Sequence, residues 1–348
     1  MNTVVRSKTT ILLIESFTIG DYVTTTAVGQ ALREMFPTAH ITLMVKPLGK
    51  EFFHDATWFD EIIFFELPWS RLGVRQLAPN LWFNMVRFGL GLRRKDFDYV
   101  VVTVRNVRHW LILNLAGHNN KVMPPKGAPV RHMDHALSAV RTLGYSGCGL
   151  PRIEIHEDNI EKTKLILAEY GLQPYNYILL HPGASHYLKR WQPIKFAELS
   201  HLLQRDGRKF AYMGHGLEDD KFILQVENIM QHKPIYIDLP LPLSIVAVSL
   251  SSAFVGMDSG FSHIAAALER PTIVLYGPSL VNHSAVVGRH VKLIDSHQNC
   301  SCNSRQNYQI TKCALLKRPC KALTSISAEE VFLAWQVLIK YSNRECTS

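Results

Sequence analysis

The sequence contains no uninterrupted apolar run long enough to span a bilayer. Its start, MNTVVRSKTTILLIESF, carries two basic residues, but the apolar run ILLI is shorter than the core of a secretion signal and no small-residue cleavage site follows. A segment of low hydrophobicity, which would favour disorder, is also absent. We therefore expect a folded, cytoplasmic protein.

Signatures of phosphate-binding loops and of nucleic-acid-binding folds are absent as well. The segment GLGLRRKDF contains a GxG pattern, but it lies in a helical pattern rather than after a strand, and the third glycine is missing. No P-loop, zinc-finger, RRM or homeodomain pattern accompanies the formal charge of +9. We expect no nucleic-acid partner, and the basic balance favours a phosphate-bearing substrate or an anionic membrane face.

The sequence does contain a short apolar strand, a turn and a helix, repeated along 348 residues. This length is typical of two domains, and 47% hydrophobic against 19% charged residues is typical of globular ones. Several strands are apolar on both faces, as parallel strands covered by helices must be, which predicts an α/β fold with two open sheets. The expected strands are Thr10–Glu15, Ile41–Val45, Glu61–Phe65, Tyr99–Val104, Tyr177–Leu180, Phe210–Met213, Ile235–Leu239, Phe254–Met257 and Thr272–Tyr276.

The domain junction is expected in HEDNIEKTKLILAEYGLQPYNY. This helical pattern stops at Gly171, and Pro174 cannot continue it. We place the domains at 1–165 and 172–348. The C-terminal segment ISAEEVFLAWQVLIKYS begins at Ser327 with the S-x-x-E pattern of a capping box, which predicts a long terminal helix.

The stretch from Leu67 to Lys95 carries six basic residues and no acidic one, interleaved with aromatic side chains. A core-facing helix with a solvated basic face is the favoured interpretation, and a membrane-surface element is the alternative. The basic residues are Arg71, Arg75, Arg87, Arg93, Arg94 and Lys95, and the helical spacing is that of Leu81, Met85, Phe88 and Leu92.

Asp21, in IESFTIGDYVTTTAVGQALREMFP, is the first candidate site residue. A strand ends near Glu15, a glycine-containing loop follows and a helix opens at about Asp21. Aspartate is a favoured N-cap, and local sequence alone favours this structural explanation. The functional alternative is a carboxylate at the carboxyl edge of the first strand that accepts a proton from a sugar hydroxyl.

Three turns in the second half also follow strands. In YILLHPGASHYLKRWQPIKFAEL, a Gly/Ala/Ser turn and Lys189 form a candidate phosphate cradle, while His181 is interpreted as structural. In GHGLEDD, Glu218 either complements a helix dipole or accepts hydrogen bonds from a ribose.

The third turn lies in VGMDSGFSHIAAALERPTIVLYGPS. Ser259 and Gly260 place free backbone N–H groups at a helix N-terminus, which suits a pyrophosphate, and His263 follows one turn into the helix. Asp258 is explained by an N-cap or by contacts with hydroxyls, because a carboxylate repels a phosphate.

Four of the six cysteines fall within CSCNSRQNYQITKCALLKRPC, namely Cys300, Cys302, Cys313 and Cys320. Disulfides are not expected in a cytoplasmic protein, and four thiolates at this spacing are candidate ligands of a structural zinc or iron. The usual CxxC knuckles are missing, so a cluster without metal stays the alternative.

In order along the chain, IGDYVTTTAVGQALREMFP, HPGASHYLKRWQPIKFAEL, GHGLEDD and GMDSGFSHIAAALERPTIVLYGPS resemble the bacterial ADP-heptose:lipopolysaccharide heptosyltransferase family, glycosyltransferase family 9. The resemblance implies a GT-B architecture, two Rossmann-like α/β domains facing a central cleft. Residues 1–165 would then bind the acceptor and residues 172–348 the nucleotide sugar, with the terminal helix packing back on the first domain.

The implied reaction is an inverting transfer of heptose from ADP-L-glycero-D-manno-heptose to a lipopolysaccharide core, with no cofactor required for catalysis. The implied location is the cytoplasm, with peripheral association at the cytoplasmic face of the inner membrane. By position, Asp21 is the implied general base. The other implied residues all contact the donor. Ser185 and Lys189 would hold its phosphates, Glu218 its nucleoside and Asp258 its sugar hydroxyls. The rest of the donor site would be formed by Ser259, Gly260 and His263.

Two departures leave the acceptor open. Where the family often has an acid and a glutamine after the fourth strand, this chain has Thr103 and Arg105. The cysteine cluster is similar to the tail of relatives that transfer heptose to protein and bind iron there, although its spacing differs. The alternatives are therefore a protein-directed heptosyltransferase with a metal-bound cysteine tail, and a non-catalytic protein that binds a sugar nucleotide or a membrane surface.

Overall fold

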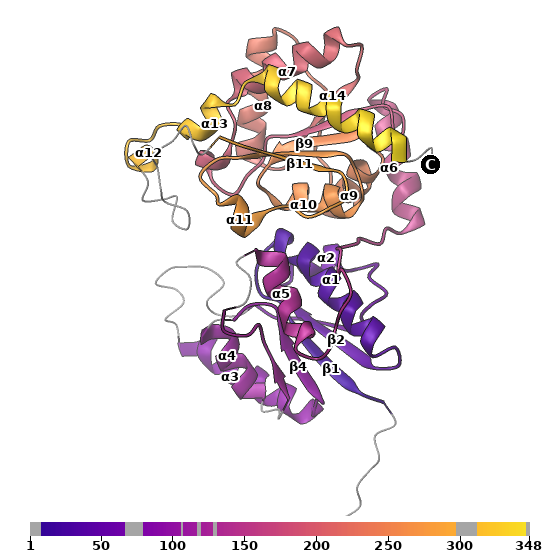
Figure 1. Cartoon of the computed structure of the whole chain (residues 1–348), viewed down its shortest axis with the longest axis vertical. Coiled ribbons are helices and arrows are strands. Elements are labelled where there is room, and N and C mark those ends of the chain that lie inside the picture. The colour runs from indigo at the N-terminus through magenta and orange to yellow at the C-terminus, as the bar shows by residue number, and fades with distance from the viewer. Residues whose placement is uncertain are drawn as a thin grey trace, which may run out of the picture. The chain divides into compact units, whose positions relative to one another are not determined.

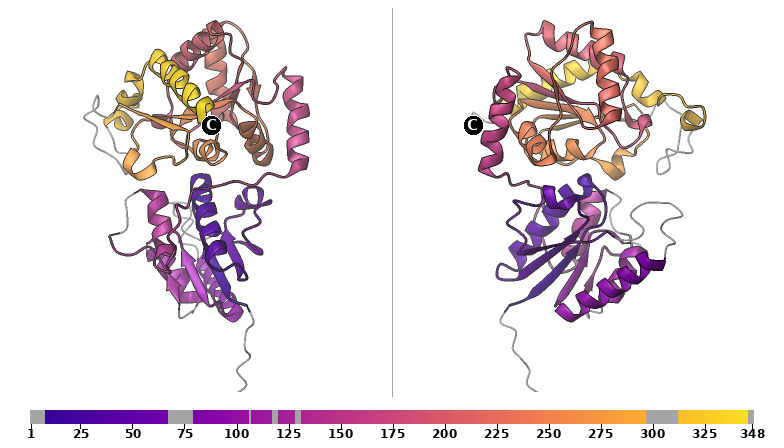
Figure 2. Two further views of the ribbon diagram at one scale, coloured as in Figure 1. Left: turned by 45° about the vertical axis from the view of Figure 1, so that its right-hand side comes forward. Right: turned by 180° about the vertical axis from the view of Figure 1, so that it is seen from behind.

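The computed structural model describes residues 8–66, 79–105, 107–116, 120–127, 131–296 and 312–345. The chain divides into two compact units, 1–154 and 155–348, drawn in Figures 1 and 2. Each unit is built on one open parallel sheet with helices packed against it. The predicted α/β class with two such sheets is confirmed. Within the described residues, no helix is both long enough and apolar enough to cross a membrane.

The sheet of the first unit has five strands. They are β1 (Thr10–Ile14), β2 (His40–Val45), β3 (Glu61–Phe64), β4 (Tyr99–Val102) and β5 (Lys121–Val122). Their order is β3-β2-β1-β4-β5 and all pairings are parallel, with Leu12 opposite Thr42 and Val100. The order reverses between β1 and β4, and open α/β sheets bind ligands beyond the carboxyl ends of the strands at such a switch point.

The described residues of the first unit form five helices: α1 (Ile19–Met35), α2 (Gly49–Phe52), α3 (Pro79–Lys95), α4 (Val107–Ala116) and α5 (His132–Arg141). α1 packs against α5, and α3 against α4. Met85 and Leu92 of α3 are buried against Leu12 and Val100 of the sheet. The predicted core-facing helix with a basic outer face is therefore confirmed for α3, whereas Arg71 and Arg75 lie outside the described residues.

The sheet of the second unit has six strands. They are β6 (Ile178–His181), β7 (Phe210–Met213), β8 (Tyr236–Ile237), β9 (Ala253–Met257), β10 (Thr272–Tyr276) and β11 (Val291–Asp295). Their order is β11-β10-β9-β6-β7-β8, again all parallel. The switch point lies between β6 and β9, so ligands are expected beyond His181 and Met257.

The helices of the second unit cover this sheet. They are α6 (Glu157–Glu169), α7 (Pro193–Arg205), α8 (Leu217–Met230), α9 (Leu241–Ser249), α10 (Gly260–Ala267), α11 (Val281–Ser284), α12 (Lys312–Leu315), α13 (Lys321–Ser325) and α14 (Ala328–Glu345). α14, yellow in Figure 1, packs against α7, β10 and β11 of its own unit. The predicted packing of this helix on the first domain stays a prediction.

Helix ends follow the sequence signals. α6 ends in a Schellman motif with Gly171 at a φ of 68°, and the Leu172 N–H donates to the Leu167 carbonyl at 2.9 Å. The Ser327 hydroxyl accepts a hydrogen bond from the Glu330 N–H at 3.0 Å, which confirms the predicted cap of α14. Two strands, β5 and β11, were not expected from the sequence. Both are edge strands, one only two residues long and the other alternating between apolar and polar residues.

Candidate active site

Asp21 lies in the first turn of α1, just beyond the carboxyl end of β1. Thr18, not Asp21, is the N-cap residue. The Asp21 Oδ2 atom accepts hydrogen bonds from the Thr18 N–H and the Thr18 hydroxyl, each at 2.9 Å. The N-cap interpretation of Asp21 is therefore wrong by three positions, because Asp21 supplies the reciprocal half of a capping box.

The second carboxylate oxygen of Asp21 lies beside His132, the first residue of α5. Oδ1 is 3.1 Å from His132 Nε2, and the Asp21 side chain is 19% exposed. The capping box therefore fixes Oδ2 of Asp21, while Oδ1 lies beside the imidazole of His132. Such a held carboxylate, still open to solvent, suits a general base.

Glu15 follows β1 directly and is buried, although it is a carboxylic acid. Its Oε1 accepts a hydrogen bond from the Phe17 N–H at 2.8 Å, and its Oε2 accepts one from the Thr103 hydroxyl at 2.6 Å. Burial and then the negative charge of Asp21 raise the pKa of Glu15 to about 7, against those two hydrogen bonds and the charge of His132. The first unit thus brings two carboxyl groups and an imidazole to its switch point.

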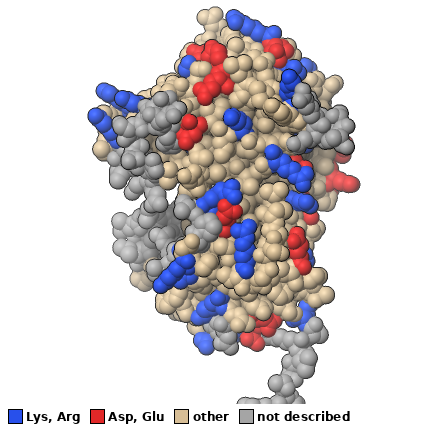
Figure 3. Space-filling model, in the orientation of Figure 1, with Lys and Arg blue, Asp and Glu red and all other residues tan. Residues whose placement is uncertain are grey.

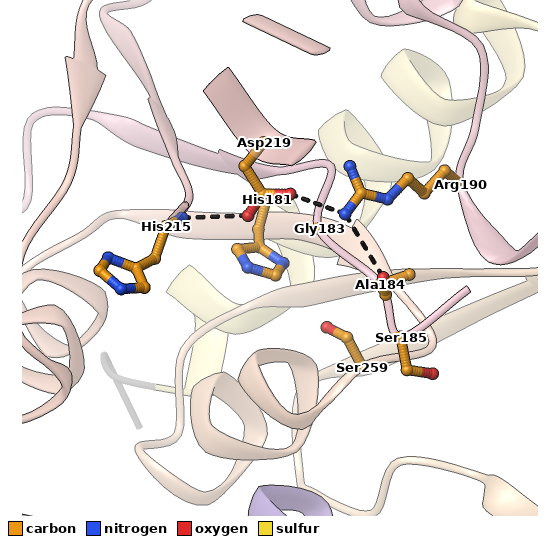
Figure 4. Close-up of a pocket in the computed structure, with 8 residues that line it drawn as sticks. All are labelled: His181, Gly183, Ala184, Ser185, Arg190, His215, Asp219 and Ser259. Carbon is orange, nitrogen blue, oxygen red and sulfur yellow. Dashed lines mark hydrogen bonds and ion pairs between the residues drawn. The ribbon is translucent and has the colours of Figure 1, made fainter. Parts of the chain in front are cut away.

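The second unit has a cavity of about 290 Å³ beyond the carboxyl ends of β6, β7 and β9. Figure 4 shows the eight residues that line it. They are His181, Gly183, Ala184, Ser185, Arg190, His215, Asp219 and Ser259. The cavity therefore lies at the switch point of the second sheet, where an α/β fold is expected to bind its ligand.

Asp219 organises one wall of this cavity, as the dashed lines in Figure 4 show. Its Oδ2 accepts a hydrogen bond from the His215 N–H at 3.0 Å, and its Oδ1 lies 2.9 Å from Nη2 of Arg190. Arg190 also donates to the carbonyl of Glu218 at 3.1 Å. The guanidinium is therefore fixed before any ligand arrives, and a fixed guanidinium suits phosphate recognition.

His181 ends β6 and its ring is buried in the same cavity. Burial lowers the pKa of His181 to about 4, although the charge of Asp219 acts in the opposite direction, so the imidazole is neutral near pH 7. Its Nδ1 has no hydrogen-bond partner among the described residues. A Cβ on Gly183 would lie 2.8 Å from the His181 ring, which explains why a glycine follows the strand here.

Lys189 and Asp258 form a nearly buried ion pair, with Nζ 2.7 Å from Oδ2. This pair explains how a carboxylate can lie beside a candidate phosphate site, because Lys189 neutralises the charge of Asp258. The N-cap of α10 is Ser259, so the N-cap interpretation of Asp258 is wrong by one position. Ser259 also lines the cavity, and its hydroxyl oxygen is buried without a partner in the part of the chain that the structure describes.

The remaining donor-site candidates differ in their surroundings. Ser185 lines the cavity. Gly260 and His263 lie in the first turns of α10 and follow Ser259, which also lines the cavity. Glu218, by contrast, is 76% exposed and pairs with Lys221 at 3.1 Å. Glu218 is not among the residues that line the cavity.

Sequence reasoning missed four of the lining residues as functional candidates: His181, Arg190, His215 and Asp219. In the sequence alone, Asp219 is explained by the dipole of the helix in whose first turn it lies, and Arg190 by exposure at the surface. A signal was available, because all four lie within nine residues of the carboxyl end of β6 or β7. The pairing joins Arg190, in the segment after β6, to Asp219, in the first turn of α8, and has no local signature.

The cysteine cluster is only partly described. Cys300 and Cys302 lie outside the described residues. Cys313 is half-buried, and Cys320 is buried in the core of the second unit. Among the described side chains there is no group of three or more His, Cys, Asp or Glu residues that could hold a metal ion. The predicted zinc or iron at this cluster stays a prediction.

Each of the two units is built on an open parallel sheet with polar side chains at its switch point, and this architecture is that of the GT-B class of glycosyltransferases. In agreement, the glycosyl transferase family 9 protein from Veillonella parvula matches 98% of this chain and 100% of its own with a TM-score of 0.79 and 20% identity. The Escherichia coli ADP-heptose lps heptosyltransferase II matches 96% of this chain and 99% of its own with a TM-score of 0.72 and 19% identity. At this identity, the likeness shows the fold.

The family model of glycosyltransferase family 9 (heptosyltransferase) matches residues 119–314, more than half of the chain. The chain therefore belongs to glycosyltransferase family 9, and the resemblance is confirmed. A curated relative, lipopolysaccharide heptosyltransferase 2 of Salmonella typhimurium, is 27% identical over 151 residues. That match spans 41% of this chain and 42% of the relative, less than half of its length.

Proposed function

We propose that this protein is an inverting heptosyltransferase that moves heptose from ADP-L-glycero-D-manno-heptose to a hydroxyl of a lipopolysaccharide core. The observation that carries the proposal is the Asp21 carboxylate, held by the Thr18 cap on one oxygen and beside His132 on the other. It stands at the switch point of a unit whose chain belongs to a heptosyltransferase family.

In this mechanism Asp21 takes the proton of the acceptor hydroxyl, and the freed electron pair forms a bond to the anomeric carbon of heptose. The bond from that carbon to the diphosphate oxygen breaks as the new one forms. Attack from the side opposite the leaving group inverts the anomeric configuration. ADP leaves with the electron pair, and no catalytic metal takes part.

The donor is proposed to bind at the cavity of the second unit. The N–H groups at Ser259 and Gly260 and the turn at Ser185 offer donors for the diphosphate, and the fixed Arg190 supplies a cation. Lys189 shares its charge between Asp258 and the phosphates. The contacts predicted for Asp258 and His263 with the donor sugar belong to the same proposal.

The contact of Glu218 with the nucleoside is the weakest element of the donor site. The exposed Glu218 side chain is not part of the cavity lining, although its carbonyl holds Arg190. A Glu218→Gln variant that keeps full donor affinity would remove Glu218 from the proposal and leave the other contacts in place.

A donor screen tests the proposal. A ligand that binds only the native state raises the thermal midpoint, so ADP-heptose is compared with UDP- and GDP-sugars at equal concentration. We expect stabilisation by ADP-heptose and by ADP, and turnover when the core acceptor is added. Preferential stabilisation by a UDP- or GDP-sugar would overturn the heptose assignment, and donor binding without turnover on any acceptor would favour the non-catalytic alternative.

The acceptor assignment is tested separately, because Thr103 and Arg105 depart from the family pattern after the fourth strand. Thr103 is engaged with Glu15, and the Arg105 side chain donates to the Pro124 carbonyl at 3.0 Å. A lipopolysaccharide core and a polypeptide are offered in parallel, with elemental analysis of the same preparation. Transfer to the polypeptide with stoichiometric zinc or iron would favour the protein-directed alternative.

Peripheral association with an anionic membrane is proposed for the outer face of α3. Phe83 is 66% exposed, and Trp82, Val86 and Leu90 are exposed as well, whereas α3 contains no acidic residue. Apolar side chains between cations are typical of interfacial helices. Elsewhere, on the face that Figure 3 shows, basic and acidic side chains are interspersed.

Co-sedimentation with vesicles tests this surface. We expect binding to phosphatidylglycerol vesicles, weaker binding to phosphatidylcholine alone, and loss of binding on Phe83→Glu. Leu333→Glu, at an exposed apolar position of α14, is the matched control. Equal losses in both variants would contradict the assignment to α3.

A further inference from the structure

Glu15 takes no part in the reaction proposed above, yet its buried carboxyl group is linked to the turn that carries Asp21. The link is the Thr25 hydroxyl, whose Oγ1 lies 3.2 Å from Glu15 Oε2 and 2.9 Å from the Asp21 carbonyl oxygen. A hydroxyl has one hydrogen to donate. If Glu15 is ionised, two acceptors therefore compete for the same hydrogen.

A protonated Glu15 removes this competition. The Thr103 hydroxyl donates to Glu15 Oε2, the acid donates to the Thr25 hydroxyl, and Thr25 donates to the Asp21 carbonyl. Each hydrogen in this chain then has its own acceptor. Directional hydrogen-bond chains of this kind strengthen their members and fix the groups at their ends.

We propose that Glu15 is a positioning residue that works in its neutral form, in which it completes the chain from Thr103 through Thr25 to the Asp21 carbonyl and so fixes the first turn of α1. Ionised Glu15 breaks this chain and also repels the Asp21 carboxylate. Asp21 is then presented less accurately to the acceptor. The inference rests on the role of Asp21 proposed above.

The groups that act on the Glu15 charge come from several elements. Asp21 of α1 opposes ionisation and His132 of α5 favours it. Tyr22 of α1 has a buried hydroxyl, and burial followed by the charges of Glu15 and Asp21 raises the pKa of that phenol. Burial raises the pKa of Glu15 to about 7, so both of its forms are present near neutral pH.

The test compares kcat of the full chain and of Glu15→Gln from pH 6 to pH 8. The glutamine amide donates to Thr25 at every pH, so the variant keeps the part of the chain from Thr25 to the Asp21 carbonyl, which the wild type loses on ionisation. The ratio of wild-type to variant kcat is expected to fall by up to about tenfold, because the protonated fraction of a group with a pKa of about 7 falls by that factor. A ratio that is constant across this range would overturn the proposal.

A pair of threonine variants separates positioning from packing. Thr25→Val removes the middle of the chain, whereas Thr24→Val removes a similar bond, from Thr24 Oγ1 to the Gly20 carbonyl at 3.4 Å, outside the chain. We expect Thr25→Val to lower kcat and abolish the pH-dependent ratio, and Thr24→Val to keep that ratio. Equal pH profiles in both variants would assign the effect to packing and overturn the proposal.

A readout without turnover keeps this inference separate from the proposed function. The difference in free energy of unfolding between Glu15→Gln and the wild type should grow as the pH rises from 4.5 to 7, because the native carboxyl group holds its proton longer than the unfolded one. If no donor supports turnover, the proposed function fails while this difference still reports Glu15 protonation. A difference in unfolding free energy that does not change with pH would overturn the claim that native Glu15 is protonated.

Discussion

The two switch-point sites differ in how their charges are balanced. In the first unit, Asp21 and Glu15 are both carboxyl groups, and the basic group that acts on both among the described residues is His132. In the second unit each carboxylate has its own cation, Lys189 with Asp258 and Arg190 with Asp219. A site with excess carboxylate suits proton acceptance, whereas a site of fixed, paired charges suits holding an anionic donor. Under the proposed function, the corresponding edges of the two sheets serve two kinds of chemistry.

The largest expected effect is that of Asp21→Asn. Asparagine keeps an acceptor for the Thr18 N–H but is no general base, so kcat should fall by about 10²–10⁴-fold. Steady-state kinetics with ADP-heptose and acceptor measure this loss. Asp134→Asn, which breaks the ion pair of Asp134 with Arg131 at the start of α5, is the control and should keep turnover near the wild-type value. An equal loss of turnover in the control would show that removing any carboxylate from a first helical turn lowers kcat, and would contradict the role of Asp21 as general base.

Next in size is Lys189→Met, which leaves Asp258 nearly buried without its cation. Breaking a buried pair costs about 3 kcal/mol, and the residual exposure of Lys189 reduces this figure. Urea denaturation measures the loss of unfolding free energy, and titration with ADP-heptose the loss of affinity. Lys195→Met, which breaks a more exposed pair with Glu198, should cost less. Similar costs in both variants would contradict a buried pair.

The two units should also respond to pH in opposite directions. The raised pKa of Glu15 lowers stability as the pH rises from 4.5 to about 7, since the unfolded state loses its proton first. The lowered pKa of His181 lowers stability as the pH falls from 6.5 to about 4, since only the unfolded state gains a proton there. Relative to wild type, Glu15→Gln should gain stability toward high pH and His181→Gln toward low pH, measured by urea denaturation. Parallel pH dependences would contradict the contrast.

The smallest expected effect is that of Thr18→Ala, which removes one hydrogen bond to the Asp21 carboxylate. Loss of a cap costs about 1 kcal/mol of unfolding free energy. Because the same bond fixes Asp21, kcat should fall as well. Ser327→Ala, which removes the cap of α14, should cost a similar free energy and leave kcat near the wild-type value. A fall of kcat in both variants would show that lost stability, not the position of Asp21, lowers turnover.

Much of the fold follows from local patterns. Strands such as β1 and β10 are buried on both sides and are therefore apolar after an initial threonine, and the stop at Gly171 depends on a backbone conformation that glycine adopts easily. The edge strands β5 and β11 were missed because an edge does not require a buried, apolar strand.

The sequence indicated the candidate site only in part, at polar residues in the turns that follow β1, β6 and β9. Asp21, Ser259 and Lys189 lie in these turns and were proposed from the sequence, although the N-caps were placed on the wrong residues. The ion pair of Arg190 and Asp219 depends on a contact between the segment after β6 and the first turn of α8, and the Glu15 environment depends on burial. Neither property is encoded in the spacing of a few residues.

The division of labour between the two units is tested most directly by the dissociation constant of ADP-heptose, measured side by side for Asp21→Asn and Lys189→Met. The account predicts that Asp21→Asn binds the donor as the wild type does, while its turnover is lost, and that Lys189→Met binds it more weakly. Donor binding weakened equally by both substitutions would contradict the account.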